Sequence, residues 1–352
     1  MNETLQNQIS ALLSSEEEVF DMQKLFGEAS ARQYFRVKTT RRSLIAMLLP
    51  EGAQSVAEEI TKTDPSFILK ELPFLNVQRY LQCGDIAVPA VFAQDATERL
   101  ILLEDLGEIS LEKCVAVFSA REQSEQRLNV YKKAIDVMLE MQSLGEKRHE
   151  NNCIAFHRRF SSELFLWELE HFREYGIEDR FQLQVNAEVR EKLRDYFTEI
   201  AQKLAALPFG LTHRDFQSCN LMLHQDRFYV IDFQDALLGP PHYDLVALLR
   251  DSYIDLSASE RHELIHYYLA RRTEYALSPL DAERFWHDFA LMTLQRKLKD
   301  AGRFQFIATV KSNPNFLPYV TQTLSYVKEA LAALPEYRDL QALLAQWVPE
   351  LR

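Results

Sequence analysis

The chain has 352 residues, of which 47% are hydrophobic and 26% charged, so it can bury a sizeable core and is not a disordered protein. Its formal net charge of −12 argues against binding to nucleic acid or to anionic membranes, because both require a basic surface. The N-terminus is polar, no apolar run is long enough to span a membrane, and the four cysteines form no CxxC, so we expect a soluble cytoplasmic protein.

The first hundred residues contain three apolar runs that are typical of strands, at 31–40, 42–50 and 99–107. Between the second and third lies PFLNVQRYLQCG, residues 73–84, which predicts a helix. Proline is favoured in the first turn of a helix, and a terminal glycine is a common stop signal. We therefore expect a small sheet accompanied by one helix.

Helical patterns dominate after Gly107. Apolar residues recur at helical spacing within 129–145, 160–176 and 186–207, and the first two of these segments end on a glycine, which predicts that the helix stops there. From residue 243 onward the chain again reads as mostly helical. The sequence thus predicts an α+β protein with a small sheet lobe, residues 1–107, and a large helical lobe, residues 108–352.

One polar stretch, LTHRDFQSCNLML at residues 211–223, interrupts the helical region and precedes a predicted hairpin of strands 221–225 and 228–232. Such a hairpin brings the loop before its first strand beside the residue that ends its second strand. Asp215, Asn220 and Asp232 should therefore lie together. Two carboxylates and an amide oxygen suit Mg²⁺, and a carboxylate free of metal can accept a proton from a hydroxyl.

The stretch HRDFQSCN resembles the catalytic loop of kinases, H-R-D-x-x-x-x-N, and IDF resembles the start of their D-F-G motif, although Gln234 replaces the glycine. The following QDALLGPPHYDLVALL is similar to the aminoglycoside phosphotransferase and choline kinase superfamily. The resemblance implies a bilobal protein-kinase-like fold that uses ATP and Mg²⁺. It makes Asp215 the base, Asn220 and Asp232 the metal ligands, and His213 a structural support.

The acceptor is expected to be a small molecule. Asp232 and Asp244 are too close together for a peptide-binding activation segment, and no A-P-E motif follows. Together, GEASARQYFRV, ILLEDLG, IDFQDALLGPPHYDL and LQRKLKDAGRF resemble the bacterial anomeric kinases of cell-wall recycling, which phosphorylate N-acetylmuramate and N-acetylglucosamine. Choline, an amino alcohol, an aminoglycoside or another sugar are alternative acceptors, as is a catalytically silent protein. The oligomeric state stays open.

The nucleotide side of the motif set is incomplete. The segment LFGEASARQYFRV has a single glycine, so Ser30, backbone amides and the arginines Arg32 and Arg36 are the candidates for phosphate contacts. Surface arginines on a hairpin are an equally good interpretation of the latter two. Met47 stands where kinases carry a strand lysine. The resemblance places Glu104 and Leu106 in the hinge, where main-chain groups would meet adenine.

Two segments are candidates for binding the acceptor. Glu168 lies in a helix with aromatic neighbours, and Gln295, Arg296 and Lys299 lie beside an apolar stripe of leucines in a later helix. These side chains suit sugar hydroxyls or a sugar carboxylate. A core stripe with a solvated back remains the alternative for both helices. Asp244 is expected to cap its helix and to brace the catalytic loop.

Overall fold

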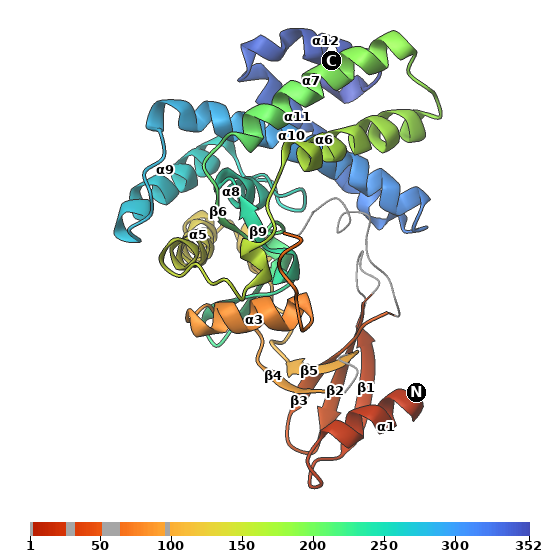
Figure 1. Ribbon diagram of the computed structural model, residues 1–352, viewed down its shortest axis with the longest axis vertical. Helices are drawn as coiled ribbons and strands as arrows, with labels where there is room; N and C mark the ends of the chain where they lie inside the picture. The colour runs from red at the N-terminus through yellow and green to blue at the C-terminus, as the bar shows by residue number, and fades with distance from the viewer. Residues whose placement is uncertain (1–2, 26–31, 51–63, 96–98) are drawn as a thin grey trace.

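The computed structural model describes residues 3–25, 32–50, 64–95 and 99–352. Figure 1 shows a small sheet with helix α1 on one side and a larger, mostly helical body on the other. The predicted α+β architecture of a small sheet lobe and a large helical lobe is therefore confirmed. No helix in the described part is long and apolar enough to cross a membrane.

The sheet of the small lobe is antiparallel throughout, in the order β1-β2-β3-β5-β4. Its strands are β1 (Val19–Leu25), β2 (Gln33–Thr39), β3 (Ser43–Leu48), β4 (Val91–Gln94) and β5 (Leu100–Glu104). The three central strands are the predicted ones. The two edge strands were not predicted, because neither contains a fully buried residue that would leave a strong apolar pattern.

The two faces of this sheet are buried against different helices. Leu44 and Ala46 pack with Leu5 of α1 (Glu3–Leu12), whereas Met47 and Ile101 belong to the main core, which includes α3 (Pro73–Cys83). Side chains alternate between the faces of a strand, so this arrangement follows from the order of residues in β3. Met47 therefore lies on the face that is turned toward α3 and the large lobe.

Ten helical segments form most of the large lobe (Figure 1). They are α4 (Leu111–Ala120), α5 (Ser124–Lys147), α6 (Ser162–His171), its π-helical continuation η2 (Phe172–Asp179), α7 (Ala187–Ala205), α8 (His242–Leu249), α9 (Ala258–Glu274), α10 (Ala282–Thr309), α11 (Val320–Ala332) and α12 (Arg338–Leu344). Six short 3-10 turns accompany them among the described residues: η1 (Ile154–Phe156), η3 (Ser218–Asn220), η4 (Phe233–Asp235), η5 (Pro314–Tyr319), η6 (Pro335–Tyr337) and η7 (Pro349–Leu351).

The two predicted glycine stops are wrong. Helix α5 continues past Gly145 to Lys147, and Gly176 lies inside η2. A Cβ atom at Gly145 would overlap the side chain of Leu211, and one at Gly176 would overlap the ring of Phe172. Gly145 therefore allows close packing against a segment that is distant in sequence, and Gly176 leaves room for a ring of its own helical turn. A local stop signal reveals neither requirement.

The predicted hairpin is present, with slightly shorter strands. Strands β7 (Leu221–His224) and β8 (Arg227–Val230) pair around a two-residue turn, and both turn residues, Gln225 and Asp226, have positive φ. Such turns match the twist of the flanking strands. A second short ladder joins β6 (Gly210–Thr212) to β9 (Leu237–Gly239), so the polar stretch lies between two paired segments.

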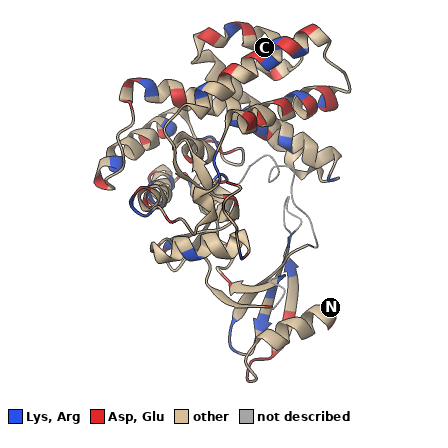
Figure 2. Ribbon diagram, viewed as in Figure 1, with Lys and Arg blue, Asp and Glu red and all other residues tan. Residues whose placement is uncertain are grey.

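The charges are distributed differently in the two lobes. Figure 2 shows acidic and basic residues interspersed along the outer helices of the large lobe, and basic residues along strands of the small sheet. Lys38 on β2 is paired with Asp21, and Arg42, in the turn between β2 and β3, is paired with Glu17. The net negative charge of the chain thus coexists with local positive charge on the small lobe.

Candidate active site

The structure brings Asp215, Asn220 and Asp232 together. The Asn220 side-chain amide donates to the Asp215 carbonyl oxygen at 2.8 Å, and the Ile231 amide donates to the Asn220 carbonyl oxygen at 3.0 Å. Asp232 is close enough to Asp215 for the charge of one carboxylate to act on the other. The hairpin therefore produces the convergence that its sequence predicts.

The loop that carries Asp215 is held by two buried carboxylates. Asp244 accepts hydrogen bonds from the amides of His213, at 2.7 Å, and Arg214, at 3.0 Å. At the other end of the loop, Asp251 accepts from the amide and the hydroxyl of Ser218, at 2.9 and 2.6 Å. Buried amides need such partners, so the two aspartates fix the main chain of the loop at both ends.

The predicted brace by Asp244 is confirmed, but the predicted helix cap is wrong. Pro241 holds the N-cap position of α8, and in the described part of the chain no side chain accepts a capping hydrogen bond there. Asp244 lies in the first turn of the helix, where the positive end of the helix dipole also favours a carboxylate. Both carboxylate oxygens of Asp244 point at the loop, where they accept from the His213 and Arg214 amides.

Arg214 has a positive φ of 81°, which costs a non-glycine residue about 1–3 kcal/mol. Both polar groups of its main chain are engaged. Its amide donates to Asp244, and its carbonyl oxygen accepts from the guanidinium of Arg296 at 2.8 Å. The strained backbone is thus maintained by buried partners on α8 and α10, and this conformation sets the position of the following residue, Asp215.

His213 has the supporting role that the family resemblance implies. Its Nδ1 accepts from the Asp215 amide at 3.2 Å, which leaves Nε2 to donate to the Ile231 carbonyl oxygen at 3.0 Å. The ring is fully buried. It therefore links the catalytic loop to the strand that leads to Asp232 and acts through the main chain.

The two carboxylates differ electrostatically. Burial works against ionisation of Asp215, but the positive charges of Lys299 and Arg296 outweigh it and hold the pKa of Asp215 below its ordinary value. Burial and the charge of Asp215 raise the pKa of Asp232. The Asp215 side chain is 37% exposed and that of Asp232 is 42% exposed, so both can meet a ligand.

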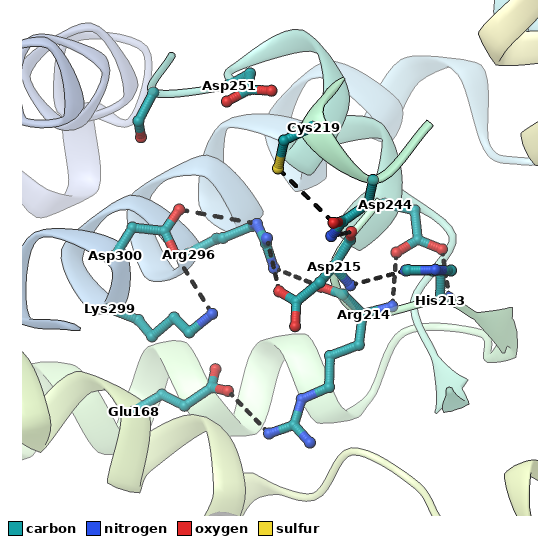
Figure 3. A network of polar contacts seen from close by, with 12 residues as sticks. Glu168, His213, Arg214, Asp215, Cys219, Asp244, Asp251, Arg296, Lys299 and Asp300 are labelled. Atoms are coloured by element: carbon teal, nitrogen blue, oxygen red, sulfur yellow. Dashed lines mark hydrogen bonds and ion pairs between the residues drawn. The ribbon is translucent and has the colours of Figure 1, made fainter. Parts of the chain in front are cut away.

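Figure 3 shows Arg214, Lys299 and Glu168 extending toward the space beside the Asp215 carboxylate. Glu168, on α6, is 1% exposed, and one oxygen accepts from Gln295 at 2.8 Å while the other lies 3.7 Å from the Arg214 guanidinium. This second oxygen has no hydrogen-bond partner among the residues that the structure describes. Carboxylate and cations facing one space suit a polyhydroxylated acceptor.

The predicted acceptor residues on α10 differ in exposure. Gln295 and Arg296 are fully buried, and the Arg296 guanidinium reaches the catalytic loop, 3.4 Å from an Asp215 oxygen. Lys299 is 18% exposed and pairs with Asp300 at 3.3 Å. The solvated helix face that the sequence left open is thus excluded for Gln295 and Arg296. We assign these two to positioning. Lys299 is kept as a candidate contact, and Glu168, although equally buried, is kept because one of its oxygens lacks a hydrogen-bond partner among the described residues.

On the nucleotide side, Arg32 reaches Asp232, with 3.2 Å between Nη1 and Oδ1. Tyr34 lies next to it on β2, opposite Met47 of β3, and burial raises the pKa of its hydroxyl, with Arg32 acting in the opposite direction. Arg32 therefore places a positive charge beside Asp232, although Met47 stands where kinases carry their strand lysine. This places Arg32 on the side of the small lobe that faces Asp232.

The other predicted nucleotide residues have different surroundings. Arg36 pairs with Asp105 at 2.9 Å and donates to the Gly107 carbonyl oxygen, so its guanidinium is committed to the segment after β5. Glu104 accepts from the Ala90 amide at 3.1 Å, and Leu106 is buried. Ser30 lies outside the described residues. The segment that was predicted to be the hinge is thus braced by Arg36.

The residues present fit a magnesium ion. The side-chain nitrogen of Asn220 donates to the Asp215 carbonyl oxygen, and its amide oxygen has a long contact of 3.8 Å from the Cys219 thiol, which leaves that oxygen able to serve as a ligand atom. Asp232 supplies a carboxylate whose ionisation is opposed by burial and by Asp215. A divalent cation would remove that opposition, and oxygen donors of this kind are those that Mg²⁺ prefers.

Sequence reasoning missed two residues that shape this site. Asp251 holds the end of the catalytic loop, and Arg303 of α10 acts electrostatically on Asp215. The helical spacing from Arg296 through Lys299 to Arg303 was a usable signal, because residues three and four apart share one face of a helix. For Asp251, which follows α8 in an irregular segment, the sequence contains no such signal.

Removing the Asp244 carboxylate is expected to lower the free energy of unfolding by about 2–4 kcal/mol, because two buried amides lose their acceptor. Chemical denaturation of Asp244→Ala against wild type measures this. Asp195→Ala on the exposed surface of α7 is the matched control, with an expected change within about 0.5 kcal/mol. Equal stabilities of the two variants would contradict the bracing role.

A model of the phosphotransferase enzyme family matches residues 21–280, well over half of the chain. The chain belongs to this family. Similar proteins from Pseudomonas aeruginosa and Neisseria meningitidis serogroup B are both named N-acetylmuramate/N-acetylglucosamine kinase. The first is 26% identical, covering 90% of this chain and 86% of its own length, and the second is 28% identical, covering 94% and 91%. This phosphotransferase is an ATP-dependent kinase, as its catalytic motif predicted.

Solved structures agree with the fold. LicA in complex with AMP aligns with a TM-score of 0.60 at 16% identity, covering 93% of this chain and 98% of the other. The amicoumacin kinase hAmiN in complex with AMP-PNP, Ca²⁺ and Ami also aligns with a TM-score of 0.60, at 14% identity, covering 94% and 93%. The predicted protein-kinase-like fold of this phosphotransferase is therefore confirmed.

Proposed function

We propose that this kinase transfers the γ-phosphate of ATP to the anomeric hydroxyl of an amino sugar, N-acetylmuramate or N-acetylglucosamine. The observation that carries the proposal is the Asp215 carboxylate, which is 37% exposed, is held in its ionised form by Lys299 and Arg296, and lies beside Asp232. The names of the Pseudomonas and Neisseria relatives support the choice of sugar.

In this mechanism Asp215 accepts a hydrogen bond from the acceptor hydroxyl, aligns it for in-line attack on the γ-phosphorus and takes its proton as the new bond forms. An anomeric hydroxyl is more acidic than an ordinary alcohol, so a carboxylate with a depressed pKa is still a sufficient base. Arg296 and Asp244 keep the loop in place while this occurs.

The nucleotide would lie between the lobes 1–107 and 108–352. Main-chain groups near Glu104 and Leu106 would meet the base, while Arg32 would reach the phosphates from the small lobe. Asn220 and Asp232 would hold Mg²⁺, which supplies charge neutralisation for the transferring phosphoryl group. Arg36 supports the hinge through Asp105, so its part in this arrangement is indirect.

The direct test is to incubate the purified full-length chain with MgATP and each of N-acetylmuramate, N-acetylglucosamine, choline and an aminoglycoside. ADP release gives the rate, and ³¹P NMR identifies the phosphorylated atom. We expect rapid turnover with one or both amino sugars and a phosphate on carbon 1. Phosphate on choline or on the aminoglycoside, with neither sugar modified, would overturn the proposal.

We also propose that the enzyme works in the cytoplasm, because the ATP that it uses is available there.

A further inference from the structure

Three cations occupy successive turns on one side of α10. Arg296, Lys299 and Arg303 are three and four residues apart, which places them along one face of the helix. The charges of Lys299 and Arg296 act on the Asp215 carboxylate, and that carboxylate in turn acts on Arg303. This face of α10 therefore lies alongside the catalytic loop over about two helical turns.

Arg303 differs from the other two in its partners. Arg296 lies 3.4 Å from Asp215, and Lys299 lies 3.3 Å from Asp300. Among the described residues, no carboxylate lies within 4.0 Å of the Arg303 guanidinium, which instead lies 4.8 Å from the centre of the Phe306 ring. Burial lowers the pKa of Arg303, and so does the neighbouring Arg214, whereas Asp215 acts in the opposite direction.

An unpaired cation in partly buried surroundings is costly for the free protein, since neither solvent nor a counter-ion fully compensates its charge. Arg303 also lies close enough to Lys311 for its charge to lower the pKa of that lysine, although burial is the larger cause. Arg214 and Lys311 thus add positive charge near Arg303, although Asp215 is also close, and a second anion that entered would interact favourably with these cations.

Aromatic rings line the neighbouring surface. His171, at the end of α6, lies 5.2 Å from Phe306 and 4.6 Å from Tyr175, measured between ring centres. Burial, with smaller effects from Arg303 and Lys299, lowers the pKa of His171 to about 4, so the imidazole is neutral at pH 7. His171 is 7% exposed, and within the described part of the chain its buried Nε2 has no hydrogen-bond partner.

The close approach of α10 to η2 brings these groups together. A Cβ atom at Gly302 would lie 2.8 Å from the Phe172 Cα and 2.9 Å from the His171 carbonyl oxygen, so only glycine fits there without displacement. The widened π-helical turn of η2 packs against this point. Such turns are frequent at functional sites. Arg303, the next residue, is consequently held beside the aromatic surface.

Cation and rings together favour an organic anion over a bare phosphate. In the proposed function the nucleotide phosphates lie on the other side of the site. Arg32 is the arginine whose charge lowers the pKa of Asp232, whereas Arg303 interacts electrostatically with Asp215. Asp215 is the residue that meets the acceptor in the proposed function. Arg303 therefore lies on the acceptor side of the reacting groups.

We propose that Arg303, with Lys299, binds the carboxylate of an acidic amino sugar, so that the enzyme distinguishes N-acetylmuramate, which carries a lactyl group, from neutral N-acetylglucosamine. This inference rests on the proposed function. Guanidinium–carboxylate hydrogen bonds are among the stronger polar contacts, and the aromatic surface beside Arg303 limits competition from water.

The test compares Arg303→Gln with wild type as full-length proteins. Steady-state kinetics should show the kcat/KM for N-acetylmuramate falling by about 10- to 100-fold, mostly through KM, with a much smaller change for N-acetylglucosamine. Arg303→Lys keeps the charge and should recover part of the loss. Arg284→Gln, on the same helix but 67% exposed, is the matched control and should leave the ratio of the two kcat/KM values unchanged.

Equal losses for both sugars in Arg303→Gln would overturn the inference while leaving the proposed function intact. A wild-type enzyme that phosphorylates neither sugar would overturn both. If Arg303→Gln does not fold, the wild type itself decides the question with N-acetylmuramate and its methyl ester, which lacks the charge. The free acid should have the lower KM by about tenfold or more, and equal KM values would contradict a carboxylate-binding role.

Discussion

Replacing Asp215 with asparagine is expected to lower kcat by about 10²- to 10⁴-fold, with little change in the KM for ATP. The substitution keeps the size of the side chain and removes the group that would accept the proton. The hydrogen bonds that hold the loop go to main-chain atoms of other residues, His213 and Arg214, so they survive. Initial rates of ADP release at saturating ATP and sugar measure the effect.

Asp226→Asn is a suitable control for this variant. Asp226 is exposed at the tip of the β7–β8 hairpin and has a positive φ of 61°, which asparagine also tolerates. It removes one carboxylate from the same hairpin region without touching the site, so kcat should stay at the wild-type value. A kcat for Asp215→Asn above about one tenth of wild type would rule out Asp215 as the base.

The second large effect is expected for Asp232→Asn, which should lower kcat/KM for MgATP by about 10²- to 10³-fold and raise the Mg²⁺ concentration needed for half-maximal activity. Asp232 has a positive φ of 62°, which asparagine accepts, so the backbone should not change. The variant would lose the charged atom proposed to bind Mg²⁺ and also loses the partner of Arg32. Rates measured across a Mg²⁺ titration at fixed ATP separate metal affinity from turnover.

Asp235→Asn is the comparison that tests the choice of metal ligand. Asp235 is three residues away and, like Asp232, accepts a hydrogen bond from the Gln234 amide. Its replacement changes the local charge by the same amount, so a purely electrostatic effect would appear in both variants. We expect a clearly smaller loss for Asp235→Asn. A larger loss there than in Asp232→Asn would reassign the ligand to Asp235.

The parts of the site that were predictable from sequence depend on short-range structure. Asp215, Asn220 and Asp232 fall within one loop and one hairpin, so turn geometry and strand pairing alone bring them together. The central strands and the helices α3 and α7 followed from apolar periodicity in the same way, whereas the region after residue 243 was predicted only as mostly helical. Their roles, however, are inferred from the family resemblance and from chemistry.

The parts that were not predictable depend on what packs against an element. The spacing of Arg296 and Lys299 was visible, but only the tertiary structure shows that Arg296 is buried against the carbonyl oxygen of Arg214. Gly176 reads as a helix stop, yet it lies inside the π-helical turn against Phe172. Both cases depend on a neighbour that is distant in sequence or on a rare local geometry, and periodicity contains neither kind of information.

The catalytic loop is held chiefly through its main chain, by Asp244, Asp251 and Arg296, whereas the side chains that would face the acceptor stand on α6 and α10. Mutations of Glu168, Lys299 or Arg303 therefore leave the loop's anchoring bonds in place. Over evolutionary time such an enzyme can exchange one acceptor for another by single substitutions, with no compensating change in the loop. Acceptor choice is thus expected to diverge faster among descendants than the chemistry of the transfer.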